Sequence, residues 1–158
     1  MSTVADWDAD VDAEVSAAIT ASKYASVPTS ESVPARCVSD LRRERMGKNA
    51  YRYQIRHTHQ GADSQLASGA RFDVVETEVE IYHRLGVINV GALKVEQEYD
   101  YTIEFVVPKI QARLTPASTW AAKDSVHRVV AKPSVSLPEA VSSKVIGFTL
   151  SLAVELAP

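Results

Sequence analysis

The chain has 158 residues, of which 46% are hydrophobic and 23% are charged, and this composition excludes intrinsic disorder over most of the length. The formal net charge of −3 excludes nucleic-acid binding that is driven by an overall positive charge. The single cysteine, Cys37, excludes an intramolecular disulfide and a cysteine-based zinc cluster.

The length predicts a single domain over residues 1–158. The acidic start "MSTVADWDADVDAEV" lacks the regions of a secretory signal, and no apolar run approaches the ~20 residues of a membrane helix. We therefore expect a soluble, cytoplasmic protein that does not contact a membrane. Residues 1–7 and the Gly, Ala and Ser-rich segment 61–70 are expected to be mobile.

The first periodic segment is "DADVDAEVSAAITASKY", residues 8–24, which predicts an amphipathic helix. Asp8 or Asp10 is the expected N-cap. The apolar stripe is narrow and suits packing on a sheet, with binding of a partner protein as the alternative. The stripe contains Val11, Val15, Ala18 and Ile19.

A long β-hairpin is predicted after a short extended piece at Ala35 to Val38. Its first strand lies in "NAYRYQIRHTHQG", where Tyr and Ile alternate with Arg and Gln. Its second strand lies in "RFDVVETEVEIYHRL", where Val75, Val79 and Ile81 share a face. The segment 61–70 forms the tip.

The segment "YDYTIEFVVPKIQARL" fits a strand and a helix equally well up to Val107. Apolar residues continue at helical spacing past Pro108, and the strands need helices to cover their core face. These two points favour a helix from about Val95 to Leu114 that is kinked or broken near Pro108, with a strand as the alternative.

The C-terminal part predicts a short helical turn beginning at Thr115, a strand near 126–131, a loop over 132–144 and a final strand in "VIGFTLSLAVEL". The final strand alternates apolar residues with a small, weakly charged face that suits another protein surface. The expected fold class is α+β: a mostly antiparallel sheet of four to five strands, with helices packed on one face and a long β-hairpin.

No catalytic motif is present, so we expect no enzymatic activity and no cofactor. His57 and His59 share a strand face and would need His83 or His127 to complete a metal site, and partly buried, hydrogen-bonded histidines are the more common outcome. We therefore predict no metal site.

Two charged clusters are candidate interaction sites. Glu76, Glu78 and Glu80 lie on one strand face, where they form a solvated surface, an acid/base pair or, in a ring of subunits, the wall of a channel. The basic run "LRRERMGK" can meet phosphate or an acidic neighbouring subunit, or it can be a solvated loop. The basic residues are Arg42, Arg43, Arg45 and Lys48.

The order of elements resembles that of the tail terminator, or tail completion, proteins of long-tailed bacteriophages and related phage-like particles. The resemblance rests on the acidic N-terminal helix, the hairpin "YRYQIRHTHQGADSQLASGARFDVVETEVEIYHRL", the segment "ARLTPASTW", the strand "VHRV" and the final strand "VIGFTLSLAVEL". It spans nearly the whole chain. Pro108 inside the second helix departs from the pattern.

The resemblance implies a non-enzymatic virion protein at the junction of tail and head, assembled in the host cytoplasm. It implies a homo-hexameric ring that binds the tail-tube protein, stops tube polymerisation and offers a surface to the head connector. DNA would pass through the ring without specific binding, past a lumen that contains Glu76, Glu78 and Glu80. The hairpin tip would bind the tube through Gln60, Gly61, Asp63, Gln65 and Leu66.

Two alternatives remain open. A different virion component, such as a head-closure or tail-tube subunit, would also lack catalytic residues, but it would polymerise or bind the portal. A small α+β domain that binds a ligand or a metal, or that hydrolyses a substrate, would have a pocket lined by the histidines.

Overall fold

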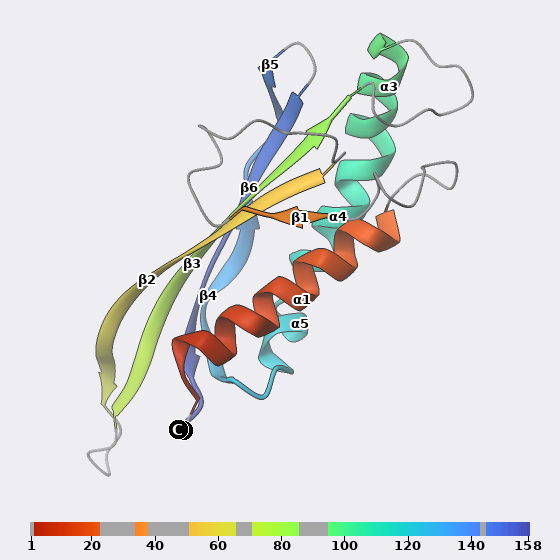
Figure 1. Cartoon of the computed structure of the whole chain (residues 1–158). Coiled ribbons are helices and arrows are strands. Elements are labelled where there is room, and N and C mark those ends of the chain that lie inside the picture. Colours follow the sequence, from red (N-terminus) through yellow and green to blue (C-terminus); the bar gives the residue numbers. More distant parts are fainter. Residues whose placement is uncertain (1, 23–33, 38–50, 66–70, 86–94, 143–144) are drawn as a thin grey trace.

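The structure is a computed structural model that describes residues 2–22, 34–37, 51–65, 71–85, 95–142 and 145–158 (Figure 1). Its helical segments and strands alternate in a mixed order along the chain. They are α1 (Val4–Ser22), β1 (Ala35–Arg36), β2 (Tyr51–Gln65), β3 (Arg71–Arg84), α3 (Val95–Tyr101), the π-helical turn η1 (Thr102–Val106), α4 (Val107–Leu114), α5 (Ala117–Ala121), β4 (Val126–Val135), β5 (Glu139–Ser142) and β6 (Val145–Leu156).

The fold is α+β, with a mixed six-stranded sheet. The main strand order is β1-β2-β3-β6-β4, and β5 also pairs with β6. All pairs are antiparallel except β1 with β2, which is parallel. The predicted fold class is therefore confirmed, whereas the predicted strand number is too low and the sheet contains one parallel pair.

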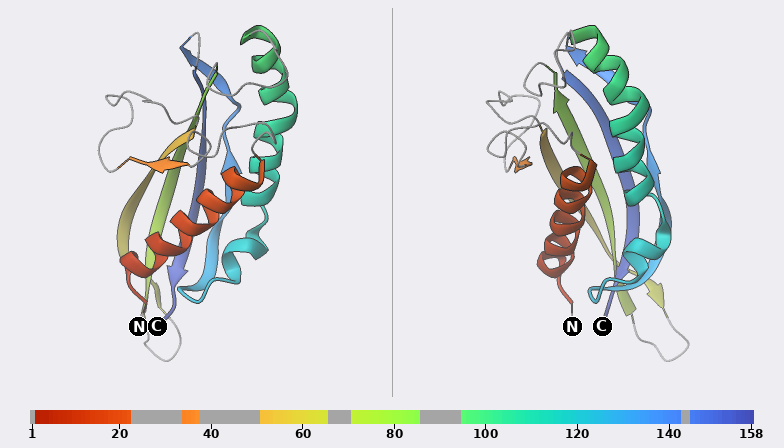
Figure 2. Two further views of the ribbon diagram at one scale, coloured as in Figure 1. Left: turned by 45° about the vertical axis from the view of Figure 1, so that its right-hand side comes forward. Right: turned by 90° about the vertical axis from the view of Figure 1, so that its right-hand side faces the viewer.

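The helices lie on one face of the sheet (Figures 1 and 2). The core fills the space between them: Val11, Val15 and Ile19 of α1 and Ile110 of α4 are fully buried together with the inward residues of β3 and β6. We call the opposite face the outer face. It carries the even-numbered residues of β2 up to Thr58, the even-numbered residues of β3 and the odd-numbered residues of β6, because side chains alternate along a strand.

Helix α1 begins earlier than predicted. Thr3 and Asp6 form a capping box, in which the Asp6 carboxylate accepts a bond from the Thr3 backbone N–H (2.7 Å) and the Thr3 hydroxyl accepts one from the Asp6 N–H (3.2 Å). Asp8 and Asp10 are therefore not the N-cap but lie inside the helix. Residues 4–7, which we expected to be mobile, form the first turn, and the Trp7 side chain is fully buried.

The segment 95–114 is helical throughout, which decides the ambiguity in favour of the helix. The chain does not break at Pro108 but forms a π-helical turn immediately before it, with the Val107 N–H donating to the Thr102 carbonyl. A proline ring clashes with the carbonyl four residues earlier in an α-helix. The wider π-turn gives that carbonyl room, so α4 can start with Pro108 in its first turn.

Two tryptophans link the helices over the sheet. The rings of Trp7 in α1 and Trp120 in α5 meet edge to face with centroids 5.6 Å apart, and both side chains are fully buried. The Trp120 indole N–H donates to the Leu114 carbonyl (2.8 Å), which satisfies a carbonyl at the C-terminal end of α4. The Trp120 side chain thus fixes the short helix α5 against α1 and α4.

The region predicted as a loop over 132–144 contains regular structure. Strand β4 continues to Val135, and β5 pairs with the start of β6 through Glu139 and Gly147. The pairing of β4 with β6 shifts register between Ala131 and Ser134, around Pro133. Proline has no N–H for a sheet ladder, so the strand accommodates it at this irregularity.

Strands β2 and β3 extend beyond the rest of the sheet at one end. The last residue of β3 that pairs with β6 is Val74, whereas β2 and β3 remain paired as far as Gln65 and Arg71. We call these outer segments, 61–65 and 71–73, the β-ribbon. The predicted tip of 61–70 is therefore too long, since 61–65 belong to β2. Residues 66–70, which would close the hairpin, lie outside the described residues.

We expect Leu114→Ala to lower the free energy of unfolding by about 2–5 kcal/mol, because the side chain is fully buried and its removal leaves a cavity. Urea denaturation followed by circular dichroism measures this value. Leu137→Ala is the matched control, since Leu137 is 88% exposed and its truncation should change stability by less than about 0.5 kcal/mol. Equal effects of the two substitutions would contradict the assignment of the core.

Candidate functional site

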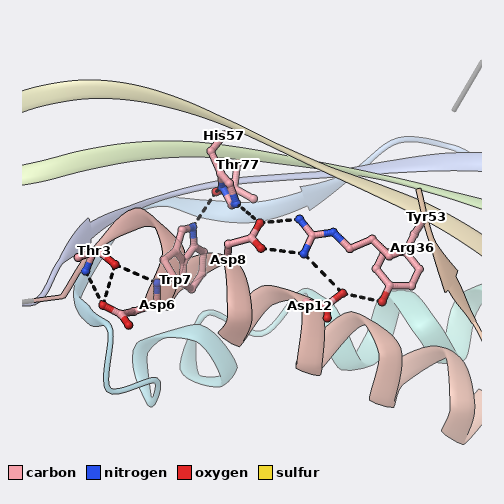
Figure 3. A network of polar contacts seen from close by, with 9 residues as sticks. All are labelled: Thr3, Asp6, Trp7, Asp8, Asp12, Arg36, Tyr53, His57 and Thr77. Carbon is pink, nitrogen blue, oxygen red and sulfur yellow. Dashed lines mark hydrogen bonds and ion pairs between the residues drawn. The ribbon is translucent and has the colours of Figure 1, made fainter. Parts of the chain in front are cut away.

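A chain of polar contacts attaches the start of α1 to the sheet (Figure 3). The Trp7 indole N–H donates to the Thr77 hydroxyl (2.8 Å), and the same hydroxyl lies 2.9 Å from Nδ1 of His57. Nε2 of His57 lies 2.7 Å from the Asp8 carboxylate. An indole N–H can only donate, so Thr77 must accept this bond. We call these residues, together with Arg36, Asp12 and Tyr53, the α1 clamp.

Arg36 of β1 closes the clamp at its other end. Its guanidinium forms two bonds of 2.7 Å to the Asp8 carboxylate and lies 3.8 Å from Asp12. The Tyr53 hydroxyl donates to Asp12 (2.6 Å). The bond from Arg36 lowers the pKa of Asp8, and burial together with Asp12 raises the pKa of Tyr53. The Asp8 and Asp12 carboxylates of α1 thus bond to side chains of β1 and β2.

The clamp contains a carboxylate, an imidazole and a hydroxyl in hydrogen-bonded order, which is the arrangement of a catalytic triad. Sequence analysis missed this arrangement, because Asp8, His57 and Thr77 come from three distant elements. The Thr77 side chain is only 2% exposed, and its oxygen already accepts the Trp7 N–H. A nucleophile must reach a substrate carbonyl, so this geometry serves attachment of α1 rather than acyl transfer.

The histidines do not converge. His59 is half exposed and lies 3.6 Å from the Asp73 carboxylate, while His83 is buried and packs edge to face on Tyr51 at 4.6 Å. His127 is exposed on β4. Within the part of the chain that the structure describes, no group of three His, Cys, Asp or Glu side chains could hold a metal ion.

The predicted carboxylate row lies on the outer face but is not uniformly solvated. Glu76 and Glu78 are exposed, whereas Glu80 is buried and lies 3.5 Å from the Arg56 guanidinium. Arg56 is the cross-strand neighbour of Glu78. The expectation of three solvated carboxylates is therefore wrong for Glu80, because an arginine on the adjacent strand neutralises it.

Arginines balance the acidic residues of the outer face. Arg52, Arg56 and Arg84 lie on this face by strand alternation, and Arg128 of β4 pairs with the buried Glu155 of β6 at 2.6 Å. The exposed part of the outer face contains a shallow depression beside Glu76 and Glu78. Its lining is polar and of both signs: Arg56, Thr58, Glu76, Thr77, Glu78 and Ser151.

The residues of β6 on the outer face are less exposed to solvent than their small side chains suggest. A Cβ atom on Gly147 would lie 2.7 Å from the Tyr82 ring, so the ring of the neighbouring strand occupies the space above this glycine. Ala153 and Glu155 are also buried, and only Ser151 is fully exposed. The bare face predicted for the final strand is therefore limited to its middle.

Several predicted interaction residues fall outside the description. Arg42, Arg43, Arg45, Lys48 and Leu66 lie outside the described residues, and for Gln60, Gly61, Asp63 and Gln65 only the backbone is described, as part of β2. Among the described helices, none is both long and apolar enough to cross a membrane.

Comparison of the chain with protein-family models and with curated proteins finds no match to either.

We expect Asp8→Asn to lower the free energy of unfolding at pH 7 by about 1 kcal/mol, since the ion pair with Arg36 is bidentate but partly exposed to solvent. A carboxyl whose pKa is lowered by folding stabilises above its unfolded pKa, near 3.9, and loses this contribution as the pH falls through the folded pKa. The difference from the wild type should therefore shrink at pH 3.

Urea denaturation at the two pH values measures this difference. Asp124→Asn is the matched control, because Asp124 is exposed, and its substitution should change stability by less than about 0.5 kcal/mol. A difference between Asp8→Asn and the wild type that is the same at pH 3 as at pH 7 would show that the Asp8 charge does not stabilise the fold.

A second pH effect comes from His83, whose burial lowers its pKa to about 3. The unfolded chain binds a proton at this residue below about pH 6.5, whereas the folded chain does not until about pH 3. The free energy of unfolding should therefore fall by roughly 1.4 kcal/mol for each pH unit as the pH is lowered from about 6.5 to about 3. His83→Gln should flatten this slope in a denaturation series between pH 7 and pH 4, and an unchanged slope would contradict the burial of a neutral imidazole.

Proposed function

We propose that the protein is a structural component of a long-tailed phage or phage-like particle, which caps the end of the tail tube as a ring, stops its polymerisation and offers a surface to the head connector. The proposal begins from the resemblance in element order. The observation that carries it is the β-ribbon, 61–65 and 71–73, which continues past the last pair between β3 and β6.

The β-ribbon is suited to contact with another protein. Within the described residues, these segments pair only with each other and lack a third strand. An isolated pair of strands is marginally stable in water, so packing against a partner would stabilise it. The register also shifts on both sides of Gly61, which bends the ribbon. In Figure 1 the strands β2 and β3 curve away from β4 and β6 at this end.

The outer face is suited to a channel through which DNA slides. Its exposed carboxylates, Glu76 and Glu78, would repel phosphates, while Arg56 pairs with Glu80 and Arg128 pairs with Glu155. A face with balanced, internally paired charges offers few cations that would bind DNA. We therefore propose a nearly neutral lumen rather than a strongly acidic one.

A structural role also agrees with the use of the polar residues. The Asp8, His57 and Thr77 arrangement is the described site with the closest likeness to a catalytic constellation, and its hydroxyl is buried under α1. The exposed depression on the outer face is lined by Arg56, Glu76 and Glu78, and the hydroxyl of Thr77, which also lines it, is already bonded to Trp7. Both features favour an assembly function over hydrolysis.

The test is to add the purified protein to polymerising tail-tube subunits from the same genome and to image the tubes by negative-stain electron microscopy. We expect tubes that stop growing and carry a ring at one end. A variant in which 62–69 are replaced by a short Gly-Ser turn should lose capping, because most of the β2 strand of the β-ribbon is removed.

The matched control is Leu137→Ser, which changes an exposed residue outside the β-ribbon and should cap normally. Growth of uncapped tubes with the wild-type protein would overturn the proposal. Formation of tubes by the protein alone would instead assign it as a tube subunit.

A further inference from the structure

The two edges of the sheet differ in how well they resist pairing with another strand. The β4 edge contains Pro133 and register shifts, and these are devices by which edge strands avoid association. The β2 edge is regular from Tyr51 to His59 and contains neither a proline nor a lysine there. Among the residues that the structure describes, β1 pairs with this edge at Arg52 and Tyr53.

The register identifies which backbone groups of β2 point outward. The Tyr53 carbonyl accepts the Cys37 N–H on the β1 side, so Tyr53 points away from β3. In an antiparallel ladder, both backbone groups of a residue point the same way and the direction alternates. The pairing with β3 is unbroken up to His59. Ile55, His57 and His59 therefore direct their N–H and C=O groups to the open edge, and none of the described residues bonds to these groups.

This window of residues 55–59 is self-complementary. A second β2 strand in antiparallel orientation, centred on His57, would pair Ile55 with His59 of the second copy and His57 with its own equivalent. Each pair would exchange two backbone hydrogen bonds, so every outward group in the window would be satisfied.

The limits of the window fit the same symmetry. β1 occupies the edge at Tyr53, four residues before His57, and the β2 register breaks between His59 and Gly61, four residues after it. In the symmetric pair, residue 61 of one copy would meet β1 of the other. The register of β2 shifts before residue 61, so the regular pairing of the two copies ends before that point.

We propose that the free protein forms a two-fold dimer by antiparallel pairing of residues 55–59 of β2, which joins two sheets into one. A window of five residues gives few hydrogen bonds, so the dimer is weak and depends on protein concentration. The dimer is independent of the proposed function, because it concerns the chain without a partner. Its two-fold symmetry also differs from the head-to-tail symmetry of a ring.

The first test is backbone amide hydrogen exchange of the full chain, followed by NMR over a range of protein concentrations. The amides of Ile55, His57 and His59 should become more protected as the concentration rises. The amides of Gln54, Arg56 and Thr58 point to β3 and should be protected at all concentrations. Outward amides that exchange at the same rate at every concentration would overturn the proposal.

The second test is sedimentation velocity of His59→Pro beside His59→Ala. The proline removes an outward N–H without breaking the ladder to β3, and it should raise the dimer dissociation constant by about tenfold or more. The alanine keeps the N–H, loses the same contact to Asp73, and should dimerise like the wild type. A His59→Pro variant that dimerises as tightly as the wild type would overturn the proposal. If it fails to fold, amide exchange of the wild type decides.

Discussion

The bond from the Trp7 indole to the Thr77 hydroxyl is the contact on which the arrangement of α1 depends. Both side chains are buried, so loss of this bond would leave an indole N–H without an acceptor in the core. The bond fixes the depth of α1 above β3, and the ring contact with Trp120 extends the same restraint to α5. His57 and Asp8 then fix the direction of the helix, since they join it to β2 and to Arg36.

Because the helices attach to one face of the sheet, the opposite, outer face is the one that they leave open to solvent. Because α1 and α4 cover the apolar side of β3 and β6, the remaining side carries Glu76, Glu78 and the paired arginines. The β-ribbon extends past the last pair between β3 and β6, so within the described chain its two strands pair only with each other. An assembly protein needs surfaces of this kind: a stable layer, and an extension that a partner completes.

Local patterns predicted the elements whose structure depends on nearby residues. Alternation identified β6, and helical spacing identified the helix to Leu114 despite Pro108. The failures are one local contact, the cap at Thr3, and two distant ones: the ion pair between Arg56 and the buried Glu80, and the joining of Asp8, His57 and Thr77. A serine or threonine three residues before an acidic one was a readable signal for the cap. The other two depend on strand register and on helix placement, which periodicity does not determine.

The acidic residues of α1 show how composition alone misleads. Alternation of acidic and small residues at the N-terminus indicates a solvated helix end, yet each of these carboxylates has a specific partner. Asp10 accepts the Ser125 hydroxyl, and Glu14 bonds to Lys123 at 2.8 Å and to Arg113 at 3.3 Å. Asp8 and Asp12 bind on the opposite flank of the helix. The acidic residues thus hold α1 along both sides of its apolar stripe, because these carboxylates bond to β1, β2 and the segment that leads into β4.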